Sequence, residues 1–301
     1  MHNQPAFTPP SISFIGAGRL ATGLALALAE GGIALTGVAS RSRASAEKLA
    51  TRLPGCSALD PQQAVDTAEL VFITVPDDAI AAVAASLRWR AGMSVVHCSG
   101  ATEIAALAPA ADAGARIGGF HPMQAFTDPE AALASLPGCT VSIETEEEQS
   151  GGPAPLQASL EALAAAIGCR TIRLPAGCRA RYHASGGYAS QFVNVLMREA
   201  TTIWRSFGVG EAEAIRALLP LLKGTLAAIE NAGIAQGMPG PVSRGDVGTI
   251  QRHVADLAAV SPEILDLYRE LALRTVPIAV ERGSLEVEKA ETLRKLLSPR
   301  G

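Results

Sequence analysis

The sequence predicts an α/β protein, with a doubly wound and mostly parallel sheet in its first half and an all-helical second half. Three observations favour this class. From residue 11 to about residue 175, short apolar runs alternate with Ala- and Leu-rich segments of helical period. Beyond Gly177 only long helical patterns follow. The 301 residues are 48% apolar and 18% charged, which is typical of a compact chain with a large core.

Strands are expected where short apolar runs rich in Val and Ile are bounded by Gly, Pro or polar residues. The runs that meet this description are Ser11–Ile15, Ala34–Ala39, Leu70–Val75, Ser94–His97, Arg116–Gly119, Thr140–Ile143 and Thr171–Leu174. The acidic stretch from Glu144 to Pro155 contains two glycines and is expected to be a solvated surface loop.

The second half predicts helices over residues 181–207, 211–231, 247–259, 262–281 and 286–297. The first of these has a polar side formed by His183, Gly187, Ser190, Gln191 and Asn194. Such a side suits a helix that lines a cleft, and a solvent face or a tight helix contact explains it equally well. The length and the change of pattern predict two domains, residues 10–178 and 179–301.

The net charge and the cysteine pattern argue against several classes of protein. The formal net charge of −4, without a cluster of Lys and Arg, argues against a nucleic-acid partner. Five cysteines without a C-x-x-C pair or zinc-ligand spacing predict reduced thiols and no metal site. Residues 1–10 lack the features of a signal peptide, and the apolar stretch 20–29 is too short to cross a membrane. We expect a soluble cytoplasmic protein.

A glycine-rich turn follows the first predicted strand and opens the first predicted helix: Gly16-Ala17-Gly18-Arg19-Leu20-Ala21. In a G-x-G-x-x-A turn, the first Gly permits a sharp bend, and the second lets the backbone approach a pyrophosphate held at the helix N-terminus. Strand, turn, helix and second strand follow in the order and spacing of a dinucleotide-binding unit. We therefore expect residues 16–20 to bind a dinucleotide.

The residues at the end of the second predicted strand indicate which dinucleotide the chain binds. NAD-binding proteins usually have Asp or Glu there to bind the ribose 2′-hydroxyl, whereas this chain has Ser40, Arg41 and Arg43 nearby. Arginines can pair with a 2′-phosphate, so the sequence predicts NADP(H); two solvated arginines at a helix start are the alternative. Val75 and Pro76 should also lie at the cofactor edge of the sheet, with the aspartates after them as helix caps or cofactor neighbours.

Hydride transfer at a carbon that bears oxygen or nitrogen also moves a proton, and His is the side chain that titrates near neutral pH. His121 follows a predicted strand and precedes a Pro, which favours catalysis or ligand contact. His97 ends a buried strand and is expected to be a hydrogen-bonded core residue. His183 begins the long helix, where substrate contact and a capping or packing role are both open.

The segment 237–246 has an unusual composition, with two Pro and three Gly that rigidify a turn. Arg244 on such a turn suits a bidentate grip on a substrate carboxylate or phosphate, and an ion pair that braces the loop is the alternative. Asp246 is expected to cap the next helix, with His253 two turns further along the same face.

These segments resemble the superfamily of 6-phosphogluconate and β-hydroxyacid dehydrogenases, ketopantoate reductases and pyrroline-5-carboxylate reductases. Four motifs look more closely like Rossmann-like proteins with a DUF2520 domain: residues 96–100 (VHCSG), 120–126 (FHPMQAF), 182–183 (YH) and 240–246 (GPVSRGD). The resemblance implies a Rossmann-type nucleotide-binding domain followed by an all-α domain like the C-terminal domain of 6-phosphogluconate dehydrogenase. It also implies a homodimer formed through the helical domain.

A local likeness to prephenate dehydrogenases implies roles for two residues. Those enzymes carry a catalytic His in a His-Pro-Met-type motif and a Ser about twenty residues earlier, near the cofactor. By this likeness His121 is the acid/base and Ser99 its hydrogen-bonding partner. One departure concerns β-hydroxyacid dehydrogenases, whose catalytic Lys precedes an Asn by four residues: here Ser190 precedes Asn194 at that spacing.

The leading hypothesis is an NADP(H)-dependent oxidoreductase that acts on a small anionic carbonyl, hydroxy or imine compound. His121, Ser99 and His183 form the expected catalytic set. The expected substrate-binding residues are Arg244, Gln124, Asn194 and His253. Two alternatives remain: a non-catalytic dinucleotide-binding sensor or scaffold, and an imine reductase of the pyrroline-5-carboxylate type.

Overall fold

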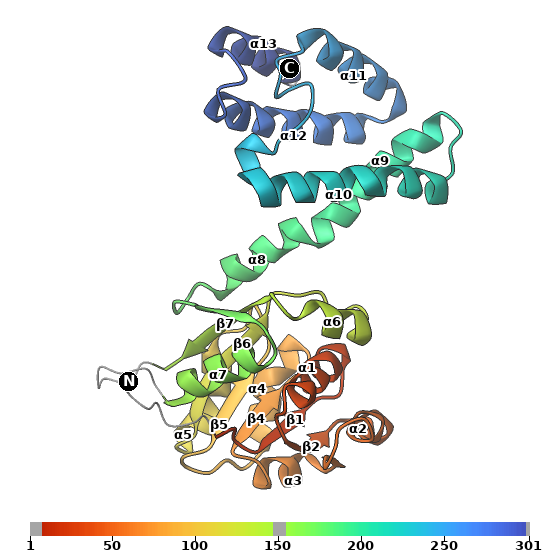
Figure 1. The fold of residues 1–301 in the computed structure, drawn as a ribbon. Coiled ribbons are helices and arrows are strands. Elements are labelled where there is room, and N and C mark those ends of the chain that lie inside the picture. Colours follow the sequence, from red (N-terminus) through yellow and green to blue (C-terminus); the bar gives the residue numbers. More distant parts are fainter. Residues whose placement is uncertain (1–7, 147–154, 299–301) are drawn as a thin grey trace. The chain divides into compact units, whose positions relative to one another are not determined.

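The computed structural model describes residues 8–146 and 155–298. The chain divides into two compact units, Met1–Ser190 and Gln191–Gly301, and each unit is described by itself. The first contains the sheet, coloured red to green in Figure 1, and the second contains the helices coloured from green to blue. The domain boundary expected after residue 178 remains a prediction.

The first unit is built on one sheet with the order β3-β2-β1-β4-β5-β6-β7-β8. Its strands are β1 (Ile12–Ile15), β2 (Leu35–Ala39), β3 (Ser57–Ala58), β4 (Leu70–Ile73), β5 (Ser94–His97), β6 (Arg116–Pro122), β7 (Thr140–Thr145) and β8 (Arg170–Arg173). Only the β6–β7 pair is antiparallel within this sheet. After β3 the chain returns to the other side of β1 to form β4, so the strand order reverses between β1 and β4. This is the predicted mostly parallel, doubly wound sheet.

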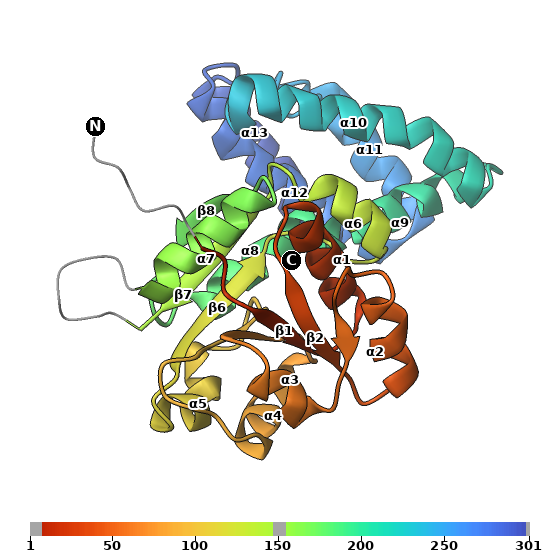
Figure 2. The same ribbon diagram turned by 60° about the horizontal axis from the view of Figure 1, so that its bottom comes forward.

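Helices cover both faces of this sheet, and two apolar clusters separate them from it. The elements are α1 (Arg19–Glu30), α2 (Arg43–Ala50), α3 (Pro61–Asp66), α4 (Ile80–Ser86), α5 (Ala108–Asp112), α6 (Pro129–Ser135), α7 (Pro155–Ala166) and α8 (Arg179–Ala189), with short 3₁₀ turns η1 (Asp77–Ala79) and η2 (Ile104–Leu107). One cluster includes Leu24 of α1 and Leu160 of α7, and the other includes Val65 of α3 and Ile80 of α4. Figure 2 shows α3, α4 and α5 together on one side of the sheet.

The central strands are apolar throughout because both of their faces are covered. All four residues of β1 and of β4 are buried. Phe14 and Phe72 stack with ring centroids 5.1 Å apart, and Phe120 of β6 meets Phe72 edge to face at 5.5 Å. These rings pack together over β1, β4 and β6, whose carboxyl ends carry the candidate site.

The second unit contains α9 (Gln191–Ser206), α10 (Glu211–Gln236), α11 (Val247–Val260), α12 (Pro262–Glu281) and α13 (Val287–Leu297). Ile250, Val276 and Leu293 lie at the centre of its core, where α11, α12 and α13 meet. No strand is present among its described residues, as predicted. Among the helices described in the chain, none is both long and apolar enough to span a membrane.

The structure corrects several expected boundaries. The single helix expected over residues 181–207 is two helices, because Ser190 leaves the helical region at φ −130° and ψ −88°. Strand β6 continues through Pro122 rather than ending at Gly119, because it pairs with the antiparallel β7 over that length. Strand β4 ends at Ile73 instead of Val75, and the two-residue β3 was not predicted.

The acidic stretch also differs in part from its expected loop. Glu144 belongs to β7 and is buried, so it is not a loop residue in solvent. Residues 147–154 of that stretch, and the first residues of the expected leader, lie outside the described part of the chain.

Candidate functional site

The glycine turn lies at the carboxyl end of β1, beside the point where the strand order reverses. Gly16 has φ 125°, and a Cβ there would come within 2.6 Å of the Thr74 carbonyl oxygen, so no larger residue fits. Its amide donates to the Ala39 carbonyl oxygen at 2.8 Å, which ties the turn to the end of β2. The turn therefore brings β1, β2 and β4 together at one edge.

Gly18 precedes α1 and leaves its N-terminus open. A Cβ on Gly18 would meet no atom within 4 Å, and no side chain caps the first turn of the helix. That turn also contains no acidic residue. Free amides and the positive end of a helix dipole are what a pyrophosphate requires, so residues 16–20 fit a dinucleotide phosphate group.

The two arginines after β2 differ in their surroundings. Arg43 is the first residue of α2, and its Nε lies 3.0 Å from Glu47 Oε1, with Asp60 3.8 Å from Nη1. Arg41 is exposed and makes no hydrogen bond or ion pair with any residue that the structure describes. Ser40 accepts a hydrogen bond from the Ser42 amide. Arg41 is therefore the cation most available to a 2′-phosphate, whereas carboxylates already neutralise part of the charge of Arg43.

His121 lies within the last part of β6, not beyond it, and α8 packs over its ring. Its Nδ1 is 3.0 Å from the Tyr182 hydroxyl, and the two rings meet edge to face. The His183 ring lies 5.8 Å away, centroid to centroid, at 82°. A Cβ on Gly100 would overlap His183 and come 2.8 Å from Nε2 of His121, so Gly100 allows this close approach.

Burial controls the protonation of His121. Loss of solvation, followed by the neighbouring His183 and the charge of Arg179, lowers the pKa of His121 from 6.5 to about 4. The ring is therefore neutral at pH 7. Nε2 has no hydrogen-bond partner among the described residues and can exchange a proton with a ligand atom.

Ser99 does not pair with His121, which corrects the expected hydrogen bond between them. Its hydroxyl donates to Asp77 Oδ2 at 2.7 Å and lies 2.9 Å from the Thr102 hydroxyl. It also accepts from the backbone amides of Ala101 and Thr102. Ser99 therefore orders the loop after β5, while a catalytic role for it remains a prediction. Asp77 binds Ser99 and caps no helix through its side chain.

His97 is a core residue as expected, but only half of its hydrogen bonding is satisfied. It is fully buried, and its Nδ1 accepts from the Ser99 amide at 3.2 Å. Its Nε2 has no hydrogen-bond partner among the described residues. Burial, with Arg179 nearby, lowers the pKa of His97 to about 4.

The remaining candidates are distributed over both units. Gln124 donates from Nε2 to the Ser135 carbonyl oxygen and accepts from the Ala125 amide, so its amide already supports the loop before α6. Asn194 is an exposed residue of α9 in the second unit. The structure therefore groups His121 with His183, and the substrate-binding role of these two amides stays a prediction.

The loop before α11 carries the other expected contacts. Asp246 caps α11 as predicted and accepts from the Thr249 amide at 3.0 Å. Arg244 is exposed and forms no ion pair with a described residue. Hydrogen bonds from Thr249 and, to a smaller extent, the charge of Arg244 lower the pKa of Asp246. Substrate contact and bracing of the loop by Arg244 therefore both stay predictions. His253 pairs with the Tyr268 hydroxyl at 2.9 Å. Both rings line a cavity of about 230 Å³ against Pro241.

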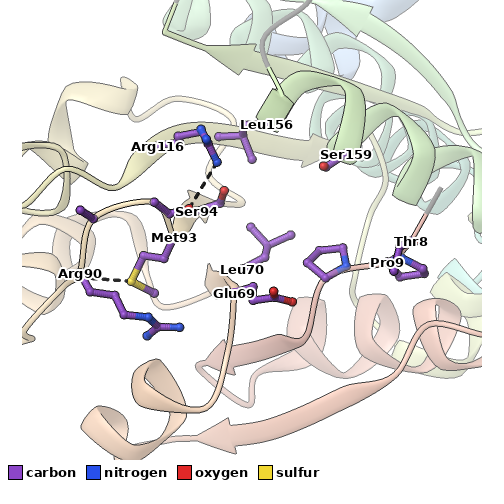
Figure 3. A pocket seen from close by; sticks show the side chains of 13 residues that line it. Thr8, Pro9, Glu69, Leu70, Arg90, Met93, Ser94, Arg116, Leu156 and Ser159 are labelled. Carbon is purple, nitrogen blue, oxygen red and sulfur yellow. Dashed lines mark hydrogen bonds between the residues drawn. The ribbon is translucent and has the colours of Figure 1, made fainter. Parts of the chain in front are cut away.

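A second cavity, of about 570 Å³, lies at the opposite edge of the sheet (Figure 3). Leu70, Ser94 and Arg116, the first residues of β4, β5 and β6, line it. Cofactors bind at the carboxyl ends of such strands, so this cavity is separate from the candidate site. It contains none of the site residues expected from the sequence.

Sequence reasoning missed three residues of the site. Tyr182 was part of a motif but had no role, although it is the direct partner of His121. Arg179 and Glu144 form a buried ion pair, and the charge of Arg179 acts on His97. A lone Glu in the apolar pattern of β7 was the available signal, because a buried carboxylate needs a cation. Among the described residues, no group of His, Cys, Asp and Glu is arranged to hold a metal ion.

Comparison with solved structures shows the same fold in other proteins. A protein from Thermotoga maritima has a TM-score of 0.70 at 24% identity, covering 90% of this chain and 98% of that one. A candidate NADP oxidoreductase from Bacteroides fragilis has a TM-score of 0.66 at 23% identity, covering 88% and 96%. The reductive aminase of Aspergillus terreus, in complex with NADPH and ethyl-5-oxohexanoate, has a TM-score of 0.59 at 19% identity, covering 96% and 93%.

Two family models match successive parts of the chain, while no curated protein matches it. The model described as a Rossmann-like domain matches residues 4–122, and the model described as a domain of unknown function (DUF2520) matches residues 149–275. The first match contains the glycine turn and His121, and the second contains Tyr182, His183 and Arg244. The chain therefore carries a Rossmann-like domain followed by a DUF2520 domain.

Proposed function

We propose that this protein is an NADP(H)-dependent oxidoreductase that transfers a hydride to or from a small anionic carbonyl, hydroxy or imine compound. One observation carries the proposal. At the reversal point of the sheet, the Gly16–Gly18 turn leaves the N-terminus of α1 open, while Arg41 remains unpaired beyond β2. An anion-binding turn with a free cation at the ribose end matches a dinucleotide that carries a 2′-phosphate.

Residues 16–20 would hold the pyrophosphate through backbone amides and the helix dipole. Arg41, assisted by Ser40 and Arg43, would bind the 2′-phosphate. Val75 and Pro76, which follow β4, would border the ribose and nicotinamide side. The NADPH complex of the Aspergillus neighbour and the description of the Bacteroides neighbour support this cofactor.

When bound, the cofactor supplies or accepts the hydride. His121 would handle the proton at the substrate heteroatom through Nε2, since Nδ1 faces Tyr182. If the Tyr182 hydroxyl donates to Nδ1, the neutral ring carries its proton on Nε2. Transfer of that proton to the substrate would draw the Tyr182 proton onto Nδ1, so that the negative charge rests on the phenolate and not on the imidazole. In the other tautomer Nε2 accepts, so the same pair serves the reverse reaction.

Substrate contacts are proposed for residues of both units. His183 lies against His121 and could hold a substrate oxygen. Arg244 presents an unpaired guanidinium suited to a carboxylate. Gln124, Asn194 and His253 complete the proposed set. Among substrate classes, the reductive aminase neighbour favours an imine or its parent carbonyl compound.

A homodimer through the helical unit is part of the same proposal. Large apolar side chains on α10 are exposed, with Leu221 at 65% and Leu226 at 58%. Exposed apolar side chains in such numbers are typical of an association surface. All five cysteines are free thiols, which supports a cytoplasmic location.

Titration with NADPH and NADH in parallel, followed by nucleotide fluorescence at modest ionic strength, tests the proposal. We expect a preference for NADPH that Arg41→Ala abolishes and that the exposed control Arg88→Ala preserves. Turnover of NADPH with a panel of keto acids and imines then separates an enzyme from a non-catalytic sensor. Absence of binding to either nucleotide would contradict the proposal.

A further inference from the structure

Three residues on adjacent strands, His97, Gly119 and Glu144, form a row across the sheet, two residues before His121 on β6. His97 of β5 lies opposite Gly119 of β6, and Gly119 lies opposite Glu144 of β7. Side chains in register on adjacent strands point to the same face. Because Gly119 has no side chain, a gap one side chain wide lies between the imidazole and the carboxylate.

The guanidinium of Arg179 fills this gap. A Cβ on Gly119 would overlap its Nη2 atom, so the arginine requires glycine at this position. Its Nε donates to Glu144, and its Nη1 donates to the Ser99 carbonyl oxygen at 2.8 Å. Arg179 is fully buried and Glu144 is 5% exposed. The first residue of α8 is thereby fastened to β7 and to the loop after β5.

The same face of α8 carries the partners of His121. Tyr182 and His183 follow Arg179 by three and four residues, which places all three on one side of the helix. The Tyr182 hydroxyl and the His183 ring both contact His121. The fastening of Arg179 therefore fixes the turn that covers the imidazole.

We propose that Arg179 is a positioning residue for His121: it holds Tyr182 and His183 against the ring and places a fixed positive charge near it. It offers only N–H donors and no acceptor, so it is not the base of the site. His97, which lies opposite Gly119, does not supply a second base beside His121. The Ser99 amide donates to His97 Nδ1, so the neutral His97 ring carries its proton on Nε2.

Among the described residues, the charged and titratable groups near His121 and its neighbours come from several elements. Helix α8 contributes Arg179, Tyr182 and His183, β5 contributes His97, and β7 contributes Glu144, which is paired with Arg179. Asp77 of η1 acts on His97, and Cys139, just before β7, acts on Tyr182. Burial by α8 and the charge of Arg179 act in the same direction, since each lowers the pKa of His121. Loss of Arg179 would therefore raise it through both effects. The catalytic use of a neutral ring rests on the function proposed above.

The experiment is an NMR titration of the His121 imidazole in the full-length protein, without nucleotide. The test variant is Arg179→Met/Glu144→Gln, which keeps the side-chain shapes and leaves no unpaired buried charge. The matched control is Arg181→Met, an exposed arginine of the same helical turn. We expect His121 to stay neutral down to pH 5.5 in the wild type and the control. In the double variant the midpoint should rise by roughly one unit, because α8 is no longer fastened and the ring is less buried, while the lost charges of Arg179 and Glu144 oppose one another.

Two results would overturn the inference: a folded double variant whose His121 midpoint equals that of the wild type, or a wild-type midpoint near 6.5. The second requires no variant, so the inference remains testable if the double variant does not fold. Gly119→Ala offers another route, because it displaces the guanidinium and should shift the midpoint in the same direction. NADPH binding by the wild type is measured separately, so failure of the proposed cofactor leaves the NMR result interpretable.

Discussion

The Tyr182 hydroxyl lies 3.0 Å from Nδ1 of His121, and the two rings stand at 86° to one another. Both residues belong to the first unit, Tyr182 on α8 and His121 on β6. The contact assigns one ring nitrogen to the protein and leaves Nε2 for a ligand. It also makes the phenol the group that sets the tautomer of the imidazole.

Removal of this phenol should weaken proton transfer without affecting the cofactor. Tyr182→Phe keeps the ring packing but leaves Nδ1 of His121 without its partner. We expect kcat to fall by about 10-fold, because the tautomer is no longer fixed, whereas His121→Ala should cost about 10² to 10⁴. NADPH affinity should stay unchanged in both variants. Steady-state kinetics on any active panel substrate provides the measurement, and full turnover by His121→Ala would refute the assignment.

The two arginines beyond β2 should differ in their effects on NADPH binding. Arg41→Ala should weaken NADPH by about 10- to 100-fold, because one charge-assisted contact contributes roughly 1.5 to 3 kcal/mol. Arg43→Ala should have a smaller effect on NADPH affinity, since Arg43 already forms ion pairs with Glu47 and Asp60. NADH affinity serves as the internal control in fluorescence titrations. Equal losses for both nucleotides would argue against a 2′-phosphate contact.

Acid should destabilise the fold through His97. Its pKa is about 4 in the folded protein, below the usual 6.5, so the folded state binds its proton less tightly than the unfolded chain does. Stability is therefore complete above pH 6.5 and decreases as pH falls toward 4, by about 3 kcal/mol for this one residue. His121 should add a loss of the same sign.

Urea unfolding at pH 7, 5.5 and 4.5 measures this slope. His97→Asn retains an oxygen that can accept from the Ser99 amide and should show a shallower slope than the wild type. If the two proteins lose stability in parallel, His97 is not the group that titrates.

The exposed apolar residues of α10 should support association. Leu221→Glu/Leu226→Glu places charges at two of these positions, which would be buried in a dimer without partners. We expect a dimeric wild type and a folded, monomeric variant in sedimentation experiments. Lys223→Glu, between the two positions on the same helix, controls for the change in charge. A monomeric wild-type protein would contradict the proposed homodimer.

The sequence was most informative where a pattern is local. The Gly16–Gly18 turn, the apolar strands β1 and β4 and the Asp246 cap all follow from neighbouring residues, and each occurs where it was expected. The extension of β6 was missed because it depends on pairing with β7, which begins eighteen residues after β6 ends at Pro122. A short stretch of sequence does not reveal which distant strand it will pair with.

The site partners were missed for the same physical reason. Glu144 resembled the start of an acidic surface loop, and only the arrival of Arg179 from a distant part of the chain explains its burial. Ser99 and His121 were expected to pair because of the likeness to prephenate dehydrogenases, but Asp77 offers the Ser99 hydroxyl a carboxyl acceptor on the neighbouring loop. The break at Ser190 also left no signal, since both flanking segments keep helical periodicity.

The helix break at Ser190 separates substitutions in the first unit from substitutions in the helical unit. Helix α8 ends before Ser190 and belongs with the sheet, so His121, Tyr182 and Arg179 are complete within the first unit. On the proposed function, substitutions in the helical unit at Arg244 or His253 would alter substrate preference and leave the contacts of His121 intact. New specificities would then arise by mutation after residue 190, while the proposed acid–base group of the first unit stays unchanged.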